Sequence, residues 1–207
     1  MLGRLKKMAG DGVAALERIV TQPEPLPAAI LASRVVLVGA SVSVHWHVEV
    51  RYPCVSVRAH YSFDKTPVVD SVLARLPVPD AVIVKQCAAY FPIPLETKKQ
   101  MVLSWLDRLA AASVVPVVAT VVPVTVAHDQ QNPGRMDGIL EYNEWIRCIA
   151  GEREMPLLDL ESALRRSSED PHLDEKWATR DGLHLRRAAY RERLDQILGP
   201  VLTRALT

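Results

Sequence analysis

Short apolar runs alternate along the chain with longer segments in which apolar and polar residues are mixed. The apolar runs lie at residues 34–39, 54–58, 81–86, 114–122 and 157–160. Runs this short and rich in aliphatic residues are typical of strands buried on both faces of a sheet. The mixed segments, which predict helices, lie at residues 41–52, 67–76, 94–112, 138–152, 161–167 and from 186 onward. This alternation predicts an α/β fold with a parallel sheet of about five strands, right-handed crossovers and helices on both faces.

Three regions do not fit the alternation. Residues 123–137 and 168–183 are polar and rich in turn formers, so we expect irregular loops there. At the amino terminus, apolar residues recur at helical spacing over residues 3–20, and a proline-rich stretch follows. We therefore expect residues 1–27 to form an amphipathic helix and a linker, and residues 28–207 to form the α/β domain. Such a helix packs on the domain, on a partner or on a second copy of the chain; contact with a membrane surface is a weaker alternative.

The composition is that of an ordinary globular protein. Of the 207 residues, 49% are hydrophobic and 24% are charged, and the formal net charge is +1. A charge so close to neutral argues against a nucleic-acid-binding protein. The three cysteines are widely spaced and form no C-x-x-C pair, so neither a disulfide framework nor a zinc site is predicted.

The turn after the first predicted strand does not have the pattern of a nucleotide-binding loop. It lacks both the G-x-G-x-x-G spacing of dinucleotide-binding turns and a P-loop lysine, so a nucleotide-binding protein is only a third hypothesis. We expect no cofactor and no metal, because His45 and His47 have no third ligand near them in the sequence. Neither a secretory signal nor a transmembrane segment is apparent, so a cytoplasmic location is the default expectation.

A serine follows the first predicted strand almost directly. Ser41 comes after Gly39 and Ala40, where the chain leaves that strand, and parallel sheets carry their functional groups at this edge. Near the other end of the chain, Asp181 precedes His184, directly before the last predicted helix. An aspartate can hold a histidine in the tautomer that accepts a proton from a serine hydroxyl, and a serine needs such a base to act as a nucleophile.

Plainer interpretations of these residues stay open. Serine is a favoured N-cap, so Ser41 could simply begin the next helix. Asp181 could cap the last helix, and His184 could be a structural histidine. The distance between the Ser41 hydroxyl and the His184 ring separates these alternatives, because a general base must lie within hydrogen-bond reach of the proton it removes.

In order and separation, these residues resemble the motifs of the SGNH (GDSL-type) hydrolases, over roughly residues 34–198. The matching segments are the turn Gly39-Ala40-Ser41, the segment Tyr142-Asn143-Glu144-Trp145, the apolar stretch at 155–160 and the pair Asp181-x-x-His184. The resemblance implies a flavodoxin-like three-layer α/β/α sandwich and the cleavage or transfer of acyl esters without a metal. It also implies that Ser41 is the nucleophile, His184 the general base and Asp181 its orienting partner.

The sequence departs from the family pattern around the oxyanion hole. Ala40 stands where the family has an aspartate, and residues 58–64 contain no glycine where the family's second motif supplies a glycine N–H. The asparagine of the third motif falls near Ala89. Each missing donor typically costs about 2.7–4 kcal/mol of transition-state stabilisation. The candidate replacement donors are the backbone N–H of Ser41 and the side chains of Ser62, Gln86 and Asn132.

Aromatic residues near the strand ends are candidates for the substrate pocket. Trp46 follows the first strand and Tyr90 the third, and Asn132 joins them as a candidate, although core packing explains such aromatic residues equally well. The sequence favours a serine esterase or O-acyltransferase that acts through an acyl-enzyme on a small-molecule or carbohydrate acyl ester, with deacetylation of a carbohydrate as one form. The alternative is a non-catalytic relative that binds a ligand after loss of the oxyanion hole.

Overall fold

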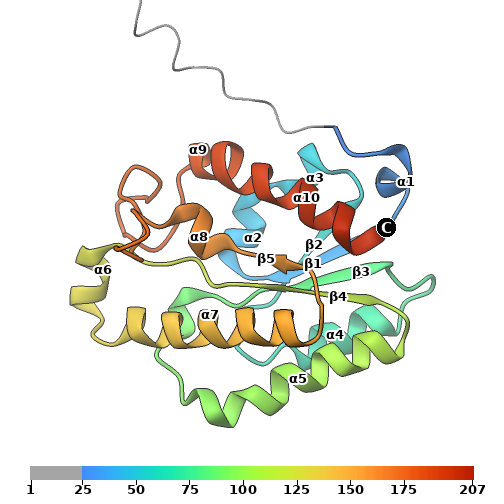
Figure 1. The fold of residues 1–207 in the computed structure, drawn as a ribbon, viewed down its shortest axis with the longest axis horizontal. Helices are drawn as coiled ribbons and strands as arrows, with labels where there is room; N and C mark the ends of the chain where they lie inside the picture. The colour runs from blue at the N-terminus through green and yellow to red at the C-terminus, as the bar shows by residue number, and fades with distance from the viewer. Residues whose placement is uncertain (1–24) are drawn as a thin grey trace, which may run out of the picture.

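The computed structural model describes residues 25–207 (Figure 1). The helix expected at residues 3–20, together with any contact made through it, lies outside the described residues. Within residues 25–207, none of the helices combines the length and the apolar character needed to cross a membrane.

In the described part of the chain, five parallel strands form one sheet in the order β2-β1-β3-β4-β5. The strands are β1 (Val35–Gly39), β2 (Val55–Ala59), β3 (Ala81–Val84), β4 (Val115–Ala119) and β5 (Leu157–Leu158). Because β1 lies between β2 and β3, the order of the strands reverses at β1. Open α/β sheets place their functional sites at such a switch point, beyond the carboxyl ends of the strands.

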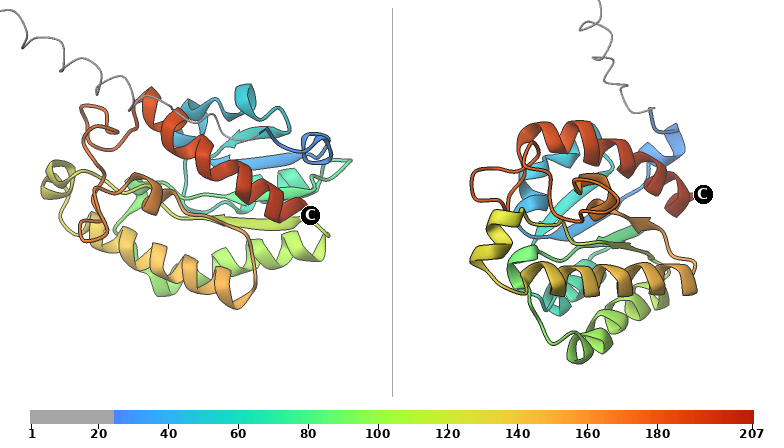
Figure 2. Two further views of the ribbon diagram at one scale, coloured as in Figure 1. Left: turned by 45° about the horizontal axis from the view of Figure 1, so that its top comes forward. Right: turned by 60° about the vertical axis from the view of Figure 1, so that its left-hand side comes forward.

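Helices cover both faces of the sheet, so the predicted three-layer α/β/α fold is confirmed (Figure 1). One layer contains α4 (Thr66–Leu73), α5 (Leu95–Ala111) and α7 (Arg135–Glu152). The other contains α1 (Ala28–Leu31), α2 (Ser41–Trp46), α3 (Val48–Arg51), α8 (Leu160–Leu164), α9 (Arg187–Ala189), the π-helical turn η2 (Tyr190–Leu194) and α10 (Asp195–Leu206). The 3-10 turn η1 (Ala88–Tyr90) and the helix α6 (Val126–Gln131) follow β3 and β4. Figure 2 shows that α6 and the loop of residues 165–186 lie at the same end of the sheet.

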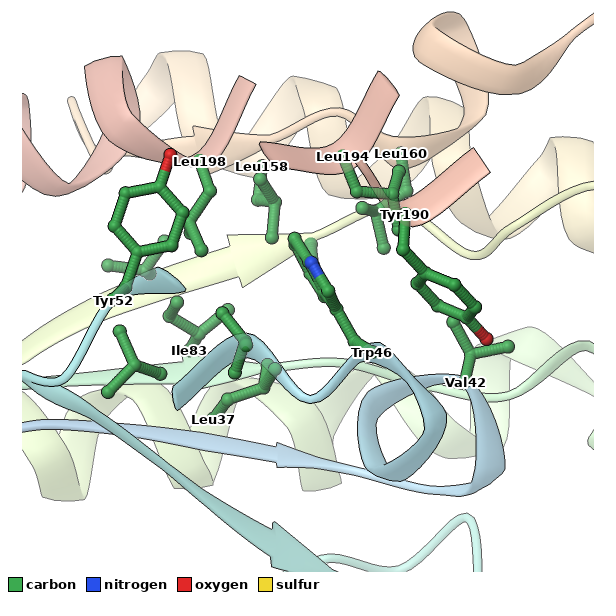
Figure 3. Close-up of a cluster of buried hydrophobic side chains, with 14 of the residues drawn as sticks. Leu37, Val42, Trp46, Tyr52, Ile83, Leu158, Leu160, Tyr190, Leu194 and Leu198 are labelled. Carbon is green, nitrogen blue, oxygen red and sulfur yellow. The ribbon is translucent and has the colours of Figure 1, made fainter. Parts of the chain in front are cut away.

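Alternate residues of the strands pack into two apolar clusters, one on each face of the sheet. In β1, Leu37 belongs to the cluster beneath α10, and Val38 belongs to the cluster beneath α5 and α7. Successive side chains of a strand point to opposite faces, and both residues are fully buried. Figure 3 shows the first cluster, in which Leu37 and Ile83 from the sheet face Leu198 of α10. Burial of each such aliphatic side chain stabilises the folded state by about 1.5–3 kcal/mol. A shift of a strand would expose these side chains, so their burial fixes where the strand ends lie.

The single helix predicted at residues 41–52 is wrong. The helix α2 ends at Trp46, His47 adopts a left-handed conformation with φ 52°, and α3 begins at the next residue. A residue in this conformation interrupts the helical hydrogen-bond ladder. The interruption lets Trp46 and Tyr52 both reach the start of α10, where Trp46 Nε1 donates to Asp195 Oδ1 at 2.8 Å and the Tyr52 hydroxyl to the Asp195 carbonyl at 2.6 Å.

The loop predicted at residues 123–137 is also wrong in part, because it contains α6. Thr125 caps this helix by accepting a hydrogen bond from the backbone N–H of His128 at 3.3 Å. A threonine before a polar helix is a weak signal, and the nearby Asn132-Pro-Gly sequence dominates the pattern. The segment expected to be irregular, residues 168–183, contains no helix or strand; only Leu173 and Ala178 take part in isolated β-bridges.

Candidate active site

The turn between β1 and α2 places Ser41 at the carboxyl edge of the sheet. The strand ends at Gly39, and a Cβ atom there would lie 1.9 Å from Ser43 Oγ, so only glycine lets the helix begin this close to the strand. The N-cap position is occupied by Ala40, and Ser41 is the first helical residue. Ser41 is therefore not the N-cap that one interpretation of the sequence allowed.

The loop before α9 carries Asp181 and His184 to the same edge. Within this loop, Gly182 has φ 69°, and a Cβ atom on it would lie 2.2 Å from Thr125 Oγ1. The Gly182 carbonyl accepts a hydrogen bond from the Thr125 backbone N–H at 3.0 Å. Close contact with the start of α6 thus fixes the loop. The N-cap of α9 is Arg186, so the interpretation of Asp181 as a helix cap is wrong.

Ser41, His184 and Asp181 form a continuous chain of hydrogen bonds. The Ser41 Oγ atom lies 3.1 Å from His184 Nε2, and His184 Nδ1 lies 2.6 Å from Asp181 Oδ2. A carboxylate can only accept, so the Nδ1 atom carries the proton and Nε2 is left to accept the proton of the Ser41 hydroxyl. The structure brings together the three residues that the sequence singled out.

Four hydrogen bonds hold the Asp181 carboxylate in its ionised form. Besides the His184 ring, its acceptors receive the backbone N–H groups of Leu183 at 2.9 Å and His184 at 3.0 Å, and the Thr179 hydroxyl at 2.7 Å. Partial burial acts to raise the pKa of Asp181, but these hydrogen bonds outweigh it and lower the pKa well below its usual range. The carboxylate is therefore charged throughout the physiological range and can stabilise a protonated His184.

The backbone N–H groups of Ser41 and Val42 come before the first helical hydrogen bonds of α2, which Ser43 and Val44 donate to the Ala40 carbonyl. The first N–H groups of a helix have no partner within it and carry the positive end of the helix dipole. They can therefore donate to an oxyanion that forms on a carbonyl carbon attached to Ser41 Oγ.

The predicted side-chain donors are placed elsewhere. The Gln86 side chain is fully buried, and its Nε2 atom donates to the Phe63 carbonyl at 2.9 Å. The Asn132 Nδ2 atom donates to the His128 carbonyl at 2.9 Å, at the end of α6. The roles proposed for Gln86 in the oxyanion hole and for Asn132 in donating to it or to substrate are therefore not supported. Ser62 is exposed in the loop after β2, and its role stays a prediction.

Two buried lysines, which the sequence analysis missed, support the loops after β2 and β3. Lys65 Nζ donates to the carbonyls of His60 at 2.8 Å and Ser62 at 2.5 Å, and Lys85 Nζ donates to the Gln86 carbonyl at 2.9 Å. Burial lowers the pKa of each ammonium group to about 8, and for Lys65 the charge of Lys85 adds to the effect. The signal in the sequence is the position of Lys85 directly after the apolar run of β3.

The two aromatic candidates occupy different places. Trp46 is buried and lines a cavity of about 850 Å³ between α2–α3 and the C-terminal helices. Tyr90 is half-buried in η1; its hydroxyl lies 3.4 Å from the His60 carbonyl, and burial, with the neighbouring Cys87 and Tyr61, raises its pKa to about 12. A substrate-binding role for Tyr90 stays a prediction. Among residues 25–207, no group of three or more His, Cys, Asp or Glu side chains is arranged to hold a metal ion.

Comparison with known proteins identifies the fold. No family model and no curated protein matches the sequence. Among solved structures, a GDSL-like lipase from Bacteroides thetaiotaomicron is 14% identical with a TM-score of 0.70, over 88% of this chain and 93% of that one. A proposed acylhydrolase from Bacteroides fragilis is 16% identical with a TM-score of 0.71, over 94% and 99%. An aryl esterase from M. smegmatis is 14% identical with a TM-score of 0.58, over 85% and 100%. The chain has the fold of the SGNH and GDSL-like hydrolases.

Proposed function

We propose that this protein is a serine hydrolase of acyl esters, with Ser41 as nucleophile, His184 as general base and Asp181 as the residue that orients His184. The observation that carries the proposal is the hydrogen-bond chain from Ser41 Oγ through the His184 ring to Asp181, with heavy-atom distances of 3.1 and 2.6 Å. The names of the structural neighbours, a lipase, a proposed acylhydrolase and an aryl esterase, support the same reaction class.

In the first half of the reaction, Ser41 Oγ attacks the carbonyl carbon of the ester, and His184 Nε2 takes the hydroxyl proton. The carbonyl oxygen becomes an oxyanion, stabilised by the N–H groups at the start of α2. The intermediate then collapses: the bond to the alcohol oxygen breaks, and the protonated His184 gives its proton to the leaving alcohol. Asp181 stabilises the imidazolium until this proton transfer. The loss of the alcohol leaves an acyl group on Ser41.

In the second half, His184 removes a proton from water, which attacks the acyl carbon and releases the acid. An acceptor alcohol in place of water gives an acyl transfer, so an esterase and an O-acyltransferase share this first intermediate. A carbohydrate ester, including an acetylated one, fits the mechanism as well as a small-molecule ester does.

Labelling with a fluorophosphonate probe tests the proposal directly, because the probe forms a covalent bond only with an activated serine. We expect one adduct per wild-type chain, and none with Ser41→Ala. Ser104→Ala, which removes an exposed hydroxyl on α5, is the control and should label like wild type. Release of p-nitrophenol from p-nitrophenyl acetate should follow the same order. A folded wild-type protein that neither labels nor cleaves the ester would overturn the proposal.

A non-catalytic ligand-binding protein is the second candidate. It is favoured by the lack of a glycine among residues 58–64, by Ala89 at the asparagine position and by the engagement of Gln86 with Phe63. This candidate predicts a protein that gains thermal stability from an acyl or carbohydrate ligand while it leaves esters intact. Measurable turnover that is lost in Ser41→Ala eliminates it.

A further inference from the structure

A cavity opens beside the proposed catalytic residues, on the side of the C-terminal helices. Its volume is about 850 Å³, and its walls come from α2 and α3 on one side and from α9, η2 and the start of α10 on the other. Cavities that bind small molecules typically measure about 300–1,000 Å³, so this one can take a ligand of moderate size.

Two lining residues of the cavity, His45 and Leu185, lie next to the proposed catalytic residues. His45, one of its lining residues, follows Ser41 by four positions on α2, which is about 6 Å along a helix. The His45 and His184 rings lie 6.0 Å apart, centroid to centroid. Leu185, which directly follows His184, also lines the cavity. A molecule bound in the cavity can therefore extend to the Ser41 hydroxyl.

The charged groups that line the cavity are mainly cationic. They include Arg51, Arg187 and Arg191, and among the described lining residues Asp195 is the only carboxylate. Within residues 25–207, neither Arg187 nor Arg191 forms a hydrogen bond or ion pair with a side chain, and both are exposed. Such guanidinium groups bind carboxylates and phosphates well, because their N–H groups form paired hydrogen bonds to two oxygens.

The single carboxylate does not cancel this charge. Asp195 is buried, and its Oδ1 atom accepts the Trp46 Nε1 hydrogen bond at 2.8 Å. Burial raises the pKa of Asp195, against the opposing effects of the Trp46 hydrogen bond and of Arg51 and Arg191. Arg187 and Arg191, which pair with no side chain of residues 25–207, can therefore meet a ligand in the cavity.

The inner wall of the cavity is aromatic. The Trp46 and Tyr190 rings lie side by side, 6.5 Å apart between centroids, between α2 and the C-terminal helices (Figure 3). Both rings are largely buried, so they present only a small apolar surface to the cavity. An apolar wall with cationic groups at its edge fits a molecule that has both apolar and anionic parts.

From these observations we infer that the ester substrate carries an anionic group, a carboxylate or a phosphate, which binds in this cavity against Arg187 and Arg191 while the ester carbonyl lies at Ser41. The inference rests on the proposed function and narrows its substrate class. Neutral esters reach Ser41 without the arginine contacts, so they are the poorer substrates.

Matched pairs of esters test the inference. We would compare 4-acetoxybenzoate with its neutral methyl ester, 4-acetoxyphenyl phosphate with neutral phenyl acetate, and p-nitrophenyl hemisuccinate with neutral p-nitrophenyl butyrate. The first two pairs separate carboxylate from phosphate, and the third places the charge on the acyl side. In wild type we expect kcat/KM to be roughly ten- to a hundredfold higher for the anionic member of at least one pair, mainly through KM.

The double variant Arg187→Gln/Arg191→Gln should bring this ratio close to one, and 0.5 M salt should reduce it in wild type. Arg75→Gln removes an exposed arginine near the amino ends of the strands and should leave the ratio unchanged. Melting curves check that each variant is folded. Turnover of neutral esters with no anionic preference, or a preference that survives the double variant, overturns the inference and leaves the proposed function standing. Failure to cleave every ester overturns the proposed function, and the inference with it.

Discussion

The loop after β1 and the loops after β2 and β3 meet at the same edge of the sheet, yet they are built in opposite ways. The first presents a hydroxyl in contact with a histidine and an aspartate, and nearly every polar atom of that group has a partner. In the other two loops the polar groups face inward. The side chains of Lys65, Lys85 and Gln86 donate hydrogen bonds to nearby backbone carbonyls. The proposed site therefore combines a fully hydrogen-bonded group for proton transfer with an oxyanion site that would rely on backbone N–H groups.

The largest effect should come from the proton-transfer side. We expect His184→Ala to lower kcat for ester hydrolysis by about 10⁴–10⁶-fold, because Ser41 then has no base. His172→Ala is the matched control, since His172 lies in the same irregular loop and pairs with Asp170 at 2.8 Å, away from Ser41. Steady-state kinetics and circular dichroism of both variants check this. Comparable losses in the two variants would contradict the assignment of His184.

Asp181→Asn should lower kcat by about 10³–10⁴-fold, because an amide no longer selects the tautomer with the proton on Nδ1. Asp170→Asn removes the carboxylate of the other aspartate–histidine pair and should change kcat less than twofold. A reaction rate that tolerates Asp181→Asn as well as it tolerates Asp170→Asn would show that His184 needs no orienting partner.

Asp181→Asn should also alter how the free energy of unfolding depends on pH. Folding lowers the pKa of Asp181, so its carboxylate stabilises the fold above the ordinary pKa near 4, and this contribution is lost as the pH falls below that value. The difference in unfolding free energy between wild type and Asp181→Asn should therefore be larger at pH 7 than at pH 3. Urea unfolding at the two pH values measures it, and a constant difference would speak against the ionised carboxylate.

On the oxyanion side, a gain of function is the informative result. Ala89 is exposed in η1, near the position where the resemblance places an asparagine. We expect Ala89→Asn to raise kcat for p-nitrophenyl acetate by about 10–100-fold, since an added donor stabilises the transition state. Ala89→Leu has a similar volume and no donor, so it should stay at the wild-type rate. Equal rates for the two variants would show that no hydrogen-bond donor is missing at this position.

The smallest effects concern the buried lysines, and they should have opposite signs. Lys85→Met removes a buried charge that has a single acceptor, and we expect a gain in stability of about 1–3 kcal/mol at pH 7. Folding lowers the Lys85 pKa from 10.5 to about 8, so wild type gains stability as the pH rises through that window and the advantage of methionine shrinks. Urea unfolding at pH 7 and pH 10 measures both effects.

Lys65→Met is the matched variant. It leaves the carbonyls of His60 and Ser62 without their donor, so we expect a loss of about 1–3 kcal/mol despite the similar pKa of the two lysines. If both variants gain or both lose stability, the number of carbonyl acceptors does not distinguish the lysines.

The sheet and the Ser41–His184 pair could be predicted from sequence for definite physical reasons. A strand buried on both faces must be apolar throughout, so runs such as residues 34–39 stand out without any knowledge of their neighbours. Ser41 and His184 were found because their order around an α/β pattern restricts where each lies. Strand topology then brings them together, although 143 positions separate them.

Other features depend on contacts that no local pattern reveals. The left-handed His47 breaks the segment 41–52 because Trp46 and Tyr52 both reach Asp195, a residue far along the chain. The position of Gln86 at a strand end favours an oxyanion donor, but its amide donates to the Phe63 carbonyl, and a sequence does not distinguish buried lysines from surface lysines. In each case the missing information is a tertiary hydrogen bond.

The contact between Gly182 and Thr125 couples the motion of the active site to that of α6. The Thr125 backbone N–H donates to the Gly182 carbonyl at 3.0 Å, inside the short loop that joins Asp181 to His184. Exchange of this amide with deuterated solvent requires the bond to open, so its rate depends on how often the loop that carries His184 separates from the start of α6. The exchange rate of the Thr125 amide therefore measures the stability of the contact between this loop and α6, with no substrate present.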